Sequence, residues 1–312
     1  MSGVKIKTLL VGGVAALALM SSGLAFAADA PATAGEVAAP SIPAGLFLSG
    51  VAELSAGWRS VEATDDGTGD MLGVDAALRV SFPLTDYLSL QGDLSTEWYT
   101  KSPDNEGDIG EDVRTNSYVG AHLSLRDPSR GLVGVFGAYG HSALYEEDPY
   151  SMALLGVEGQ AYLGQMTLYG QMGVGDVVSD PSNDNQGFNN GWFVRGVGRY
   201  FVADNTKLEL EASYAAASPY TDGDDDGKFY GWGASAETRL TEAYPIHGTL
   251  SYRGTHLDAT TEDDTQTEHT VMLGLKMLVG EDRTLLEVDR GGATLDLPGL
   301  PLRANGATEL ID

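Results

Sequence analysis

The chain has 312 residues, a formal net charge of −27 at pH 7 and no cysteine. The lack of cysteine excludes disulfides, zinc–thiolate sites and thiol nucleophiles. The strong negative charge argues against nucleic acid as a partner, because like charges repel.

The first 27 residues predict a secretory signal peptide. A basic start with two lysines precedes an apolar run from Leu9 to Met20, and Ala25-Phe26-Ala27 matches a cleavage pattern. The apolar run is shorter than the roughly 20 residues that a helix needs to span a bilayer. Residues 28–45 are rich in alanine and proline and predict a flexible periplasmic leader. We therefore expect an exported protein of the cell envelope.

Between residues 46 and 280, short segments of alternating apolar and polar residues recur, which is typical of strands with two different faces. Long polar connections alternate with short turns along this region. Such sorting is typical of transmembrane barrels, whose long loops face outside and whose short turns face the periplasm. The alternation predicts twelve strands, at about 46–60, 71–84, 88–100, 113–126, 132–144, 152–163, 166–177, 191–202, 208–217, 229–241, 247–257 and 270–280.

The aromatic residues indicate which strand face meets lipid. Tryptophan prefers the bilayer interface, where its ring is buried and its N–H stays in contact with water. All four tryptophans lie on the apolar face, at the long-loop end of their strands, and predict an outer aromatic girdle of Trp58, Trp98, Trp192 and Trp232. Aromatic residues near the short turns predict a second girdle of Phe82, Tyr87, Tyr162 and Tyr200.

Together these features resemble Gram-negative outer-membrane β-barrels, in particular the smaller porin-like channels. The strand Leu273–Val279 carries a glycine followed by spaced hydrophobic residues, similar to their assembly signal, although Met277 and Val279 stand where aromatics are common. The resemblance implies an all-β, antiparallel up-and-down transmembrane barrel of about 12 strands (range about 10–14) in the outer membrane. It also implies outer-membrane lipid and lipopolysaccharide, periplasmic chaperones and the barrel-assembly machinery as partners. We expect no cofactor and no nucleic acid, and the oligomeric state stays open.

The polar strand face then points into the lumen. The inward charges either pair across the barrel and close it, or line a water-filled path on which they select ions. We favour a channel for passive diffusion of small hydrophilic solutes, with a weak anion preference from the inward arginines. A plugged structural or adhesive barrel is the alternative. The expected pore-lining residues are Arg59, Arg79, Arg114, Arg195, Arg199, Arg239, Arg253, Lys276, Asp93, Glu97, Glu209 and Glu211.

Three further features carry weaker predictions. His122 and Ser124 have the spacing of an outer-membrane lipid hydrolase, but they fall on the inward face, so we expect no enzyme. Residues 281–312 follow the last strand and predict a periplasmic tail; a tail that folds back toward the lumen is the alternative, for which the sequence carries no signal. A weak divalent-cation candidate matches only the first half of a calcium loop, since Gly233 stands where a bidentate glutamate belongs; its members are Asp222, Asp224 and Asp226.

Overall fold

The structure, a computed structural model, describes residues 42–63, 67–101, 114–143, 150–178, 188–219, 227–258, 265–280 and 282–299. The predicted signal peptide, most of the leader and the acidic triplet at 222–226 lie outside these ranges. Twelve strands are present: β1 (Ser49–Ala63), β2 (Gly67–Pro83), β3 (Leu88–Lys101), β4 (Arg114–Asp127), β5 (Gly131–Ala143), β6 (Tyr150–Leu163), β7 (Met166–Val177), β8 (Phe188–Ala203), β9 (Thr206–Pro219), β10 (Gly227–Arg239), β11 (Ile246–Asp258) and β12 (Thr265–Gly280).

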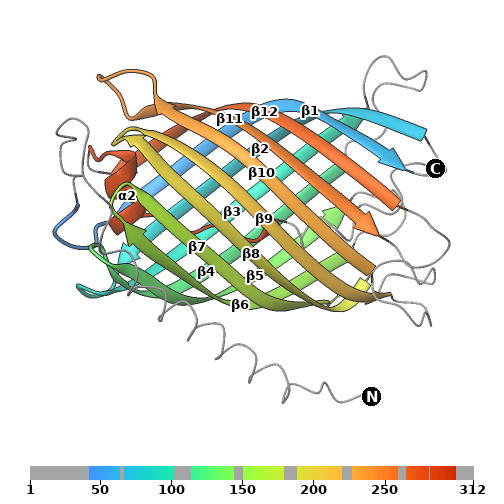
Figure 1. Cartoon of the computed structure of the whole chain (residues 1–312), viewed down its shortest axis with the longest axis horizontal. Helices are drawn as coiled ribbons and strands as arrows, with labels where there is room; N and C mark the ends of the chain where they lie inside the picture. Colours follow the sequence, from blue (N-terminus) through green and yellow to red (C-terminus); the bar gives the residue numbers. More distant parts are fainter. Residues whose placement is uncertain are drawn as a thin grey trace, which may run out of the picture. The chain divides into compact units, whose positions relative to one another are not determined.

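Each strand pairs antiparallel with its neighbours in the chain, and β1 pairs with β12, so the sheet closes into a barrel (Figure 1). Closure gives every strand two partners and leaves no free sheet edge. The prediction of a twelve-stranded up-and-down barrel is therefore confirmed. The one helix in the described ranges is α2 (Leu285–Gly291). No helix of the described residues is long and apolar enough to cross a membrane.

The outer face of the barrel is apolar. Leucines on five different strands are more than half exposed there: Leu54, Leu94, Leu155, Leu210 and Leu273. Such a surface is costly in water and stable in hydrocarbon. The four tryptophans also face outward, and the rings of Trp192, Tyr214 and Tyr230 follow one another with centroids 5.3 Å apart at each step.

The prediction for one residue of the second girdle is wrong. Phe82, Tyr87 and Tyr200 are exposed on the outer face, but Tyr162 is only 8% exposed. It points into the lumen, and the guanidinium of Arg290 lies 4.1 Å from its ring centroid. The reason is the period of two along β6, which places residue 162 on the same inward face as the buried Glu158.

The lumen is filled with apolar side chains on one side of its outer half. This apolar cluster consists of Tyr118, Phe136, Ala138, Met152, Leu154, Phe193, Ala215, Phe229 and Leu257, with Leu297 packed against it. Inward glycines make room for its rings. Phe136 pairs with Gly156 across β5 and β6, and Phe193 pairs with Gly173 across β7 and β8. Several glycines on the inward face therefore lie beneath aromatic rings and do not mark free space.

Replacing Gly156 with valine should destabilise the barrel. A Cβ atom there would lie 2.5 Å from Phe136 Cζ and 2.6 Å from the backbone oxygen of Met172, which cannot move away. We expect a loss of about 1–3 kcal/mol, as for other overpacked positions, measured by urea unfolding in detergent or lipid. Gly196→Val is the matched control, since a Cβ atom at Gly196 meets nothing within 4 Å. Equal stability of the two variants would contradict the packing role.

Candidate functional site

The described residues after β12, 282–299, form a segment that enters the barrel; we call it the C-terminal segment. Its helix α2 begins with a capping box, in which Thr284 and Glu287 satisfy each other's backbone N–H groups. The helix lies at the short-turn end of the barrel (Figure 1), where the Leu286 N–H donates to the carbonyl of Asp204 in the turn between β8 and β9 at 3.0 Å. The chain then continues into the lumen in extended form.

The sequence placed residues 281–312 in the periplasm as a tail, and the structure differs for the described part. Leu286 and Leu295 are completely buried. Leu285 and Val288 pack with inward residues of three strands, Val51, Phe201 and Leu278. Apolar side chains of a short segment gain stability only by burial, and the inner wall of the barrel offers the apolar partners. Residues 300–312 lie outside the described ranges.

Side chains of the wall satisfy the backbone of the C-terminal segment. The amide of Gln91 donates to the carbonyl of Leu295 at 2.7 Å and accepts from its N–H at 3.2 Å, as a neighbouring strand would. Arg126 donates to the carbonyl of Gly292 at 2.6 Å, and Ser49 Oγ accepts from the N–H of Ala293 at 2.6 Å. Because buried backbone groups need partners, these contacts fix the path of the segment.

Arg195 joins the wall to the C-terminal segment. Its Nη2 lies 2.7 Å from Glu211 on β9, and its Nη1 lies 2.7 Å from Asp296 Oδ1 of the segment. A second bond from Nη2 to Asp296 Oδ2, at 3.1 Å, makes the contact with Asp296 bidentate. Two parallel N–H···O bonds are the strongest and most directional arrangement of guanidinium and carboxylate.

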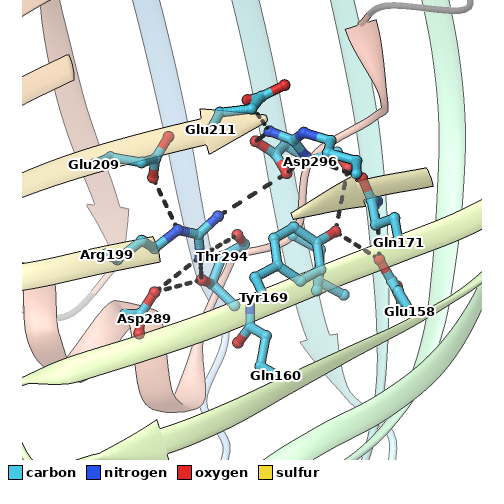
Figure 2. A network of polar contacts seen from close by, with 12 residues as sticks. Glu158, Gln160, Tyr169, Gln171, Arg199, Glu209, Glu211, Asp289, Thr294 and Asp296 are labelled. Carbon is cyan, nitrogen blue, oxygen red and sulfur yellow. Dashed lines mark hydrogen bonds and ion pairs between the residues drawn. The ribbon is translucent and has the colours of Figure 1, made fainter. Parts of the chain in front are cut away.

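Arg199, four residues further along the same face of β8, repeats the arrangement. Figure 2 shows it between the wall and the segment: Nε donates to Glu209 at 2.9 Å, and Nη1 donates to Asp289 at 2.9 Å. The same Nη1 also donates to Thr294 Oγ1 at 2.7 Å. Both arginines are therefore shared between an acid of β9 and acids of the C-terminal segment, since Arg199 also lies 3.9 Å from Asp296.

The segment acids stay ionised because of these arginines. Burial alone would raise the pKa of Asp289, but Arg199 and Arg290 outweigh burial and hold the pKa below its ordinary value of 3.8. Burial would likewise raise the pKa of Asp296, but Arg195 and Arg199 hold that pKa well below its usual range.

His122 has a structural role in the same wall. Its Nε2 lies 2.6 Å from Asp93, and its Nδ1 lies 2.8 Å from Glu158. Ser124 instead bonds to Ser89, at 2.9 Å. Because carboxylates occupy both ring nitrogens, His122 has no nitrogen free to take a proton from Ser124, and this pair does not form the hydrolase arrangement.

Several other predicted pore residues form a second set of ion pairs within the lumen. Arg59 forms an ion pair with Glu268 at 2.6 Å, and Lys276 forms one with Glu237 at 2.7 Å. Arg253 meets Glu97 at 3.3 Å, while Arg239 meets Asp282 of the C-terminal segment at 3.0 Å. Arg114 begins β4, and its side chain lies outside the described part of the structure.

A cavity of about 300 Å³ remains in the lumen, between the C-terminal segment and the wall formed mainly by β1–β3 and β8–β12. Nine acidic and six basic side chains line it. Small side chains of the wall leave the space: Ser55, Ala77, Ser95, Ser235 and Ser251. Leu285 and Val288 of α2 also line the cavity, together with Val51, Phe201 and Leu278 with which they pack, so an apolar layer bounds it toward the short turns.

The cavity contains one basic group that stands apart from the pairs. Arg79 lines the cavity and makes no ion pair with any residue that the structure describes. The sequence predicted Arg79 in the lumen but could not separate it from the paired arginines, because pairing depends on neighbouring strands and on the C-terminal segment.

Sequence reasoning missed Asp289 and Asp296, which complete the site. One signal was available: Thr284 and Glu287 have the spacing of a capping box, which predicts a helix directly before Asp289. Nothing local showed that this helix would enter the barrel.

A disulfide between Ser49→Cys and Gly292→Cys should form readily if the C-terminal segment is docked. A Cβ atom at Gly292 would lie 3.1 Å from Ser49 Cβ, close to the separation of about 3.5–4.5 Å found in disulfides, and the φ of −121° suits any residue. The natural chain has no cysteine, so the pair is unique. Non-reducing mass spectrometry should show nearly complete crosslinking of the folded protein and little in urea. Equal yields in both conditions would contradict docking.

Docking of the segment should resist mild acid. The lowered pKa of Asp289 and of Asp296 means that their stabilisation is complete above about pH 4 and is lost only as pH falls through the lowered values. A spin label on Gly299→Cys should keep its mobility from pH 7 to pH 5 and become mobile at more acidic pH. The same label with Asp289→Asn and Asp296→Asn should lack this acid transition. Release between pH 7 and pH 5 would show that other groups control docking.

No known protein family matches the chain, and no curated protein matches it. Among solved structures, an outer-membrane channel from Pseudomonas putida F1 is similar with a TM-score of 0.55 at 15% identity, covering 80% of this chain and all of that chain. The translocator domain of the autotransporter NalP from Neisseria meningitidis gives a TM-score of 0.44 at 12% identity, covering 88% of this chain and 99% of that chain. A KdgM porin in complex with disordered oligogalacturonate gives a TM-score of 0.40 at 11% identity, covering 72% of this chain and 98% of that chain. The chain thus has the fold of outer-membrane β-barrel proteins.

Proposed function

We propose that the chain is an outer-membrane channel for passive diffusion of small hydrophilic solutes, held closed here by its own C-terminal segment. The observation that carries this proposal is the cavity of about 300 Å³ with a charged lining in the middle of the barrel. A barrel used only as an anchor gains nothing from such a hollow, since twelve strands leave room that larger side chains could fill.

The C-terminal segment is suited to closing a channel because it is not part of the wall. The backbone groups of the strands are paired with neighbouring strands around the whole barrel. The segment is held instead by side chains, through ion pairs to Arg195 and Arg199 and through the apolar layer below the cavity. Its departure would leave the closed sheet intact and remove the apolar layer that separates the cavity from the short-turn end.

The charges of the lumen support weak ion selectivity. Two of the nine acidic side chains around the cavity, Asp289 and Asp296, belong to the C-terminal segment. Without the segment, the wall carries seven acidic and six basic side chains. Such a near balance supports neither strong anion nor strong cation preference, and the weak anion preference expected from the inward arginines gains no support from the net charge.

The alternative with a plugged lumen shares the closed state and differs in one property. In a structural or adhesive barrel, the C-terminal segment never leaves, and the charged pairs serve only to fill the lumen. The two functions therefore differ in whether the barrel conducts once the segment is absent or free to move.

Conductance in planar bilayers tests the proposal. A chain ending after Gly280 should conduct ions in steps, because it lacks the segment. The full-length chain should open rarely, in roughly 0.1–10% of the recording time, as expected for a minor state a few kcal/mol above the closed one. The full chain with Ser49→Cys and Gly292→Cys provides the matched control: oxidation should abolish its openings, and reduction should restore them.

Folding is verified independently by the shift in gel mobility on heating. If the shortened chain is folded and silent at all voltages, the lumen is permanently filled and the structural alternative holds. If oxidised and reduced forms of the full chain conduct equally, the C-terminal segment does not close the path.

A further inference from the structure

The arginines that hold the C-terminal segment have the geometry of a carboxylate-binding site. Asp296 accepts two N–H bonds from Arg195, at 2.7 and 3.1 Å, and its Oδ1 also lies 3.9 Å from Arg199. Asp289 accepts hydrogen bonds from Nη1 of Arg199 and from the hydroxyl of Thr294. The planar guanidinium matches a carboxylate through paired N–H bonds, which is the usual mode of carboxylate recognition.

Acceptors on the barrel wall orient these arginines independently of the segment. Glu211 on β9 accepts a hydrogen bond from Nη2 of Arg195, and Glu209 accepts one from Nε of Arg199. The remaining N–H groups then point at the positions where the carboxylates of Asp296 and Asp289 lie. With the segment docked, both guanidiniums are nearly fully buried, at 6% and 4% exposure. Without it, Arg195 would keep Gln171 and Glu211 as acceptors. Arg199 would keep Glu209, and the N–H groups that now bond to the segment would lose their partners.

A third arginine is already available. Arg79 lines the same cavity as Arg195 and Arg199, and it has no ion-pair partner among the residues described. The acids that act on Arg79 lie beyond ion-pair distance, so a solute carboxylate in the cavity can bind this guanidinium while the segment is still docked.

We infer that Arg79, Arg195 and Arg199 form a binding site for small dicarboxylate solutes, which Asp289 and Asp296 occupy as an internal substitute for the ligand. A dicarboxylate that binds Arg79 and displaces one segment carboxylate weakens the hold on the C-terminal segment. Binding of solute and docking of the segment are then mutually exclusive, so the solute favours the undocked state in proportion to its preference for that state. This inference deepens the proposed function, because it names a class of solute and the event that opens the lumen.

The covalent link between the C-terminal segment and β12 sets the concentration at which a free solute can compete with the segment for the arginines. A segment joined to β12 by a short linker acts at an effective concentration of about millimolar. Displacement should therefore need a solute concentration in the millimolar range.

The test measures docking, not conduction. The chain with Ser49→Cys and Gly292→Cys is oxidised with and without succinate, and the rate of crosslinking is followed. Succinate at about 1–50 mM should slow crosslinking severalfold relative to sodium chloride of equal ionic strength, because a displaced segment brings the two thiols together less often. The neutral analogue succinamide, of nearly the same size, should have no effect.

Arg79→Gln is the matched variant. Because Arg79 attracts Asp296 without forming an ion pair with it, crosslinking without succinate should slow far less than in Arg195→Gln, while the effect of succinate should fall severalfold. If succinate slows crosslinking no more than sodium chloride does, the arginines serve only as anchors and the inference is wrong. Equal slowing by succinamide, or by sulfate at the same charge, would equally overturn the assignment to carboxylates.

The outcomes separate this inference from the proposed function. A shortened chain that is silent in bilayers, combined with succinate-dependent release, would reject the channel and keep the carboxylate site. A conducting shortened chain whose segment ignores succinate would keep the channel and reject the site.

Discussion

The arrangement of the lumen depends on two arginines placed four residues apart on β8. A buried guanidinium is stable only when acceptors surround it, and Arg195 and Arg199 each obtain acceptors from both the wall and the C-terminal segment. The wall acids orient the guanidiniums, and the remaining N–H groups decide where Asp289 and Asp296 lie. The position of the segment in turn decides which part of the lumen is filled and which part stays open.

The wall of the barrel and the contents of its lumen are stabilised by different interactions. The strands satisfy their backbone groups among themselves, so the wall does not depend on what the lumen contains. The lumen is then arranged in layers: an apolar cluster that includes Phe136 and Phe193 on one side of the outer half, a charged cavity in the middle, and an apolar layer under α2 at the short-turn end. The buried ion pairs of the charged layer lie between two apolar layers, where electrostatic interactions are stronger than in bulk water.

This layering connects structure with the proposed function. Contacts made by side chains and by a short helix are easier to exchange than strand pairing, because they can be replaced by water or by a solute one at a time. The C-terminal segment makes only such contacts with the wall, apart from a few backbone bonds at its helix. An element of this kind suits a closure that is stable and still removable.

The sequence alone determined the wall. The period of two in segments such as 71–84, the alternation of long and short connections and the outward tryptophans all follow from local pattern, because each strand of a transmembrane barrel must present apolar residues to lipid on one face. It also placed Arg195, Arg199, Glu209 and Glu211 on the inner face.

Tertiary structure alone decided the contents of the lumen. The pairing of Arg199 with Asp289 joins residues 90 positions apart, and the burial of Tyr162 beneath Arg290 depends on a helix that lies outside every strand pattern. Inward residues have no lipid to constrain them, so their sequence shows no period that distinguishes a ring lying over a glycine from open space. It likewise does not distinguish an arginine in an ion pair from Arg79, which makes none with the residues described. Those differences arise only when distant segments meet inside the closed barrel.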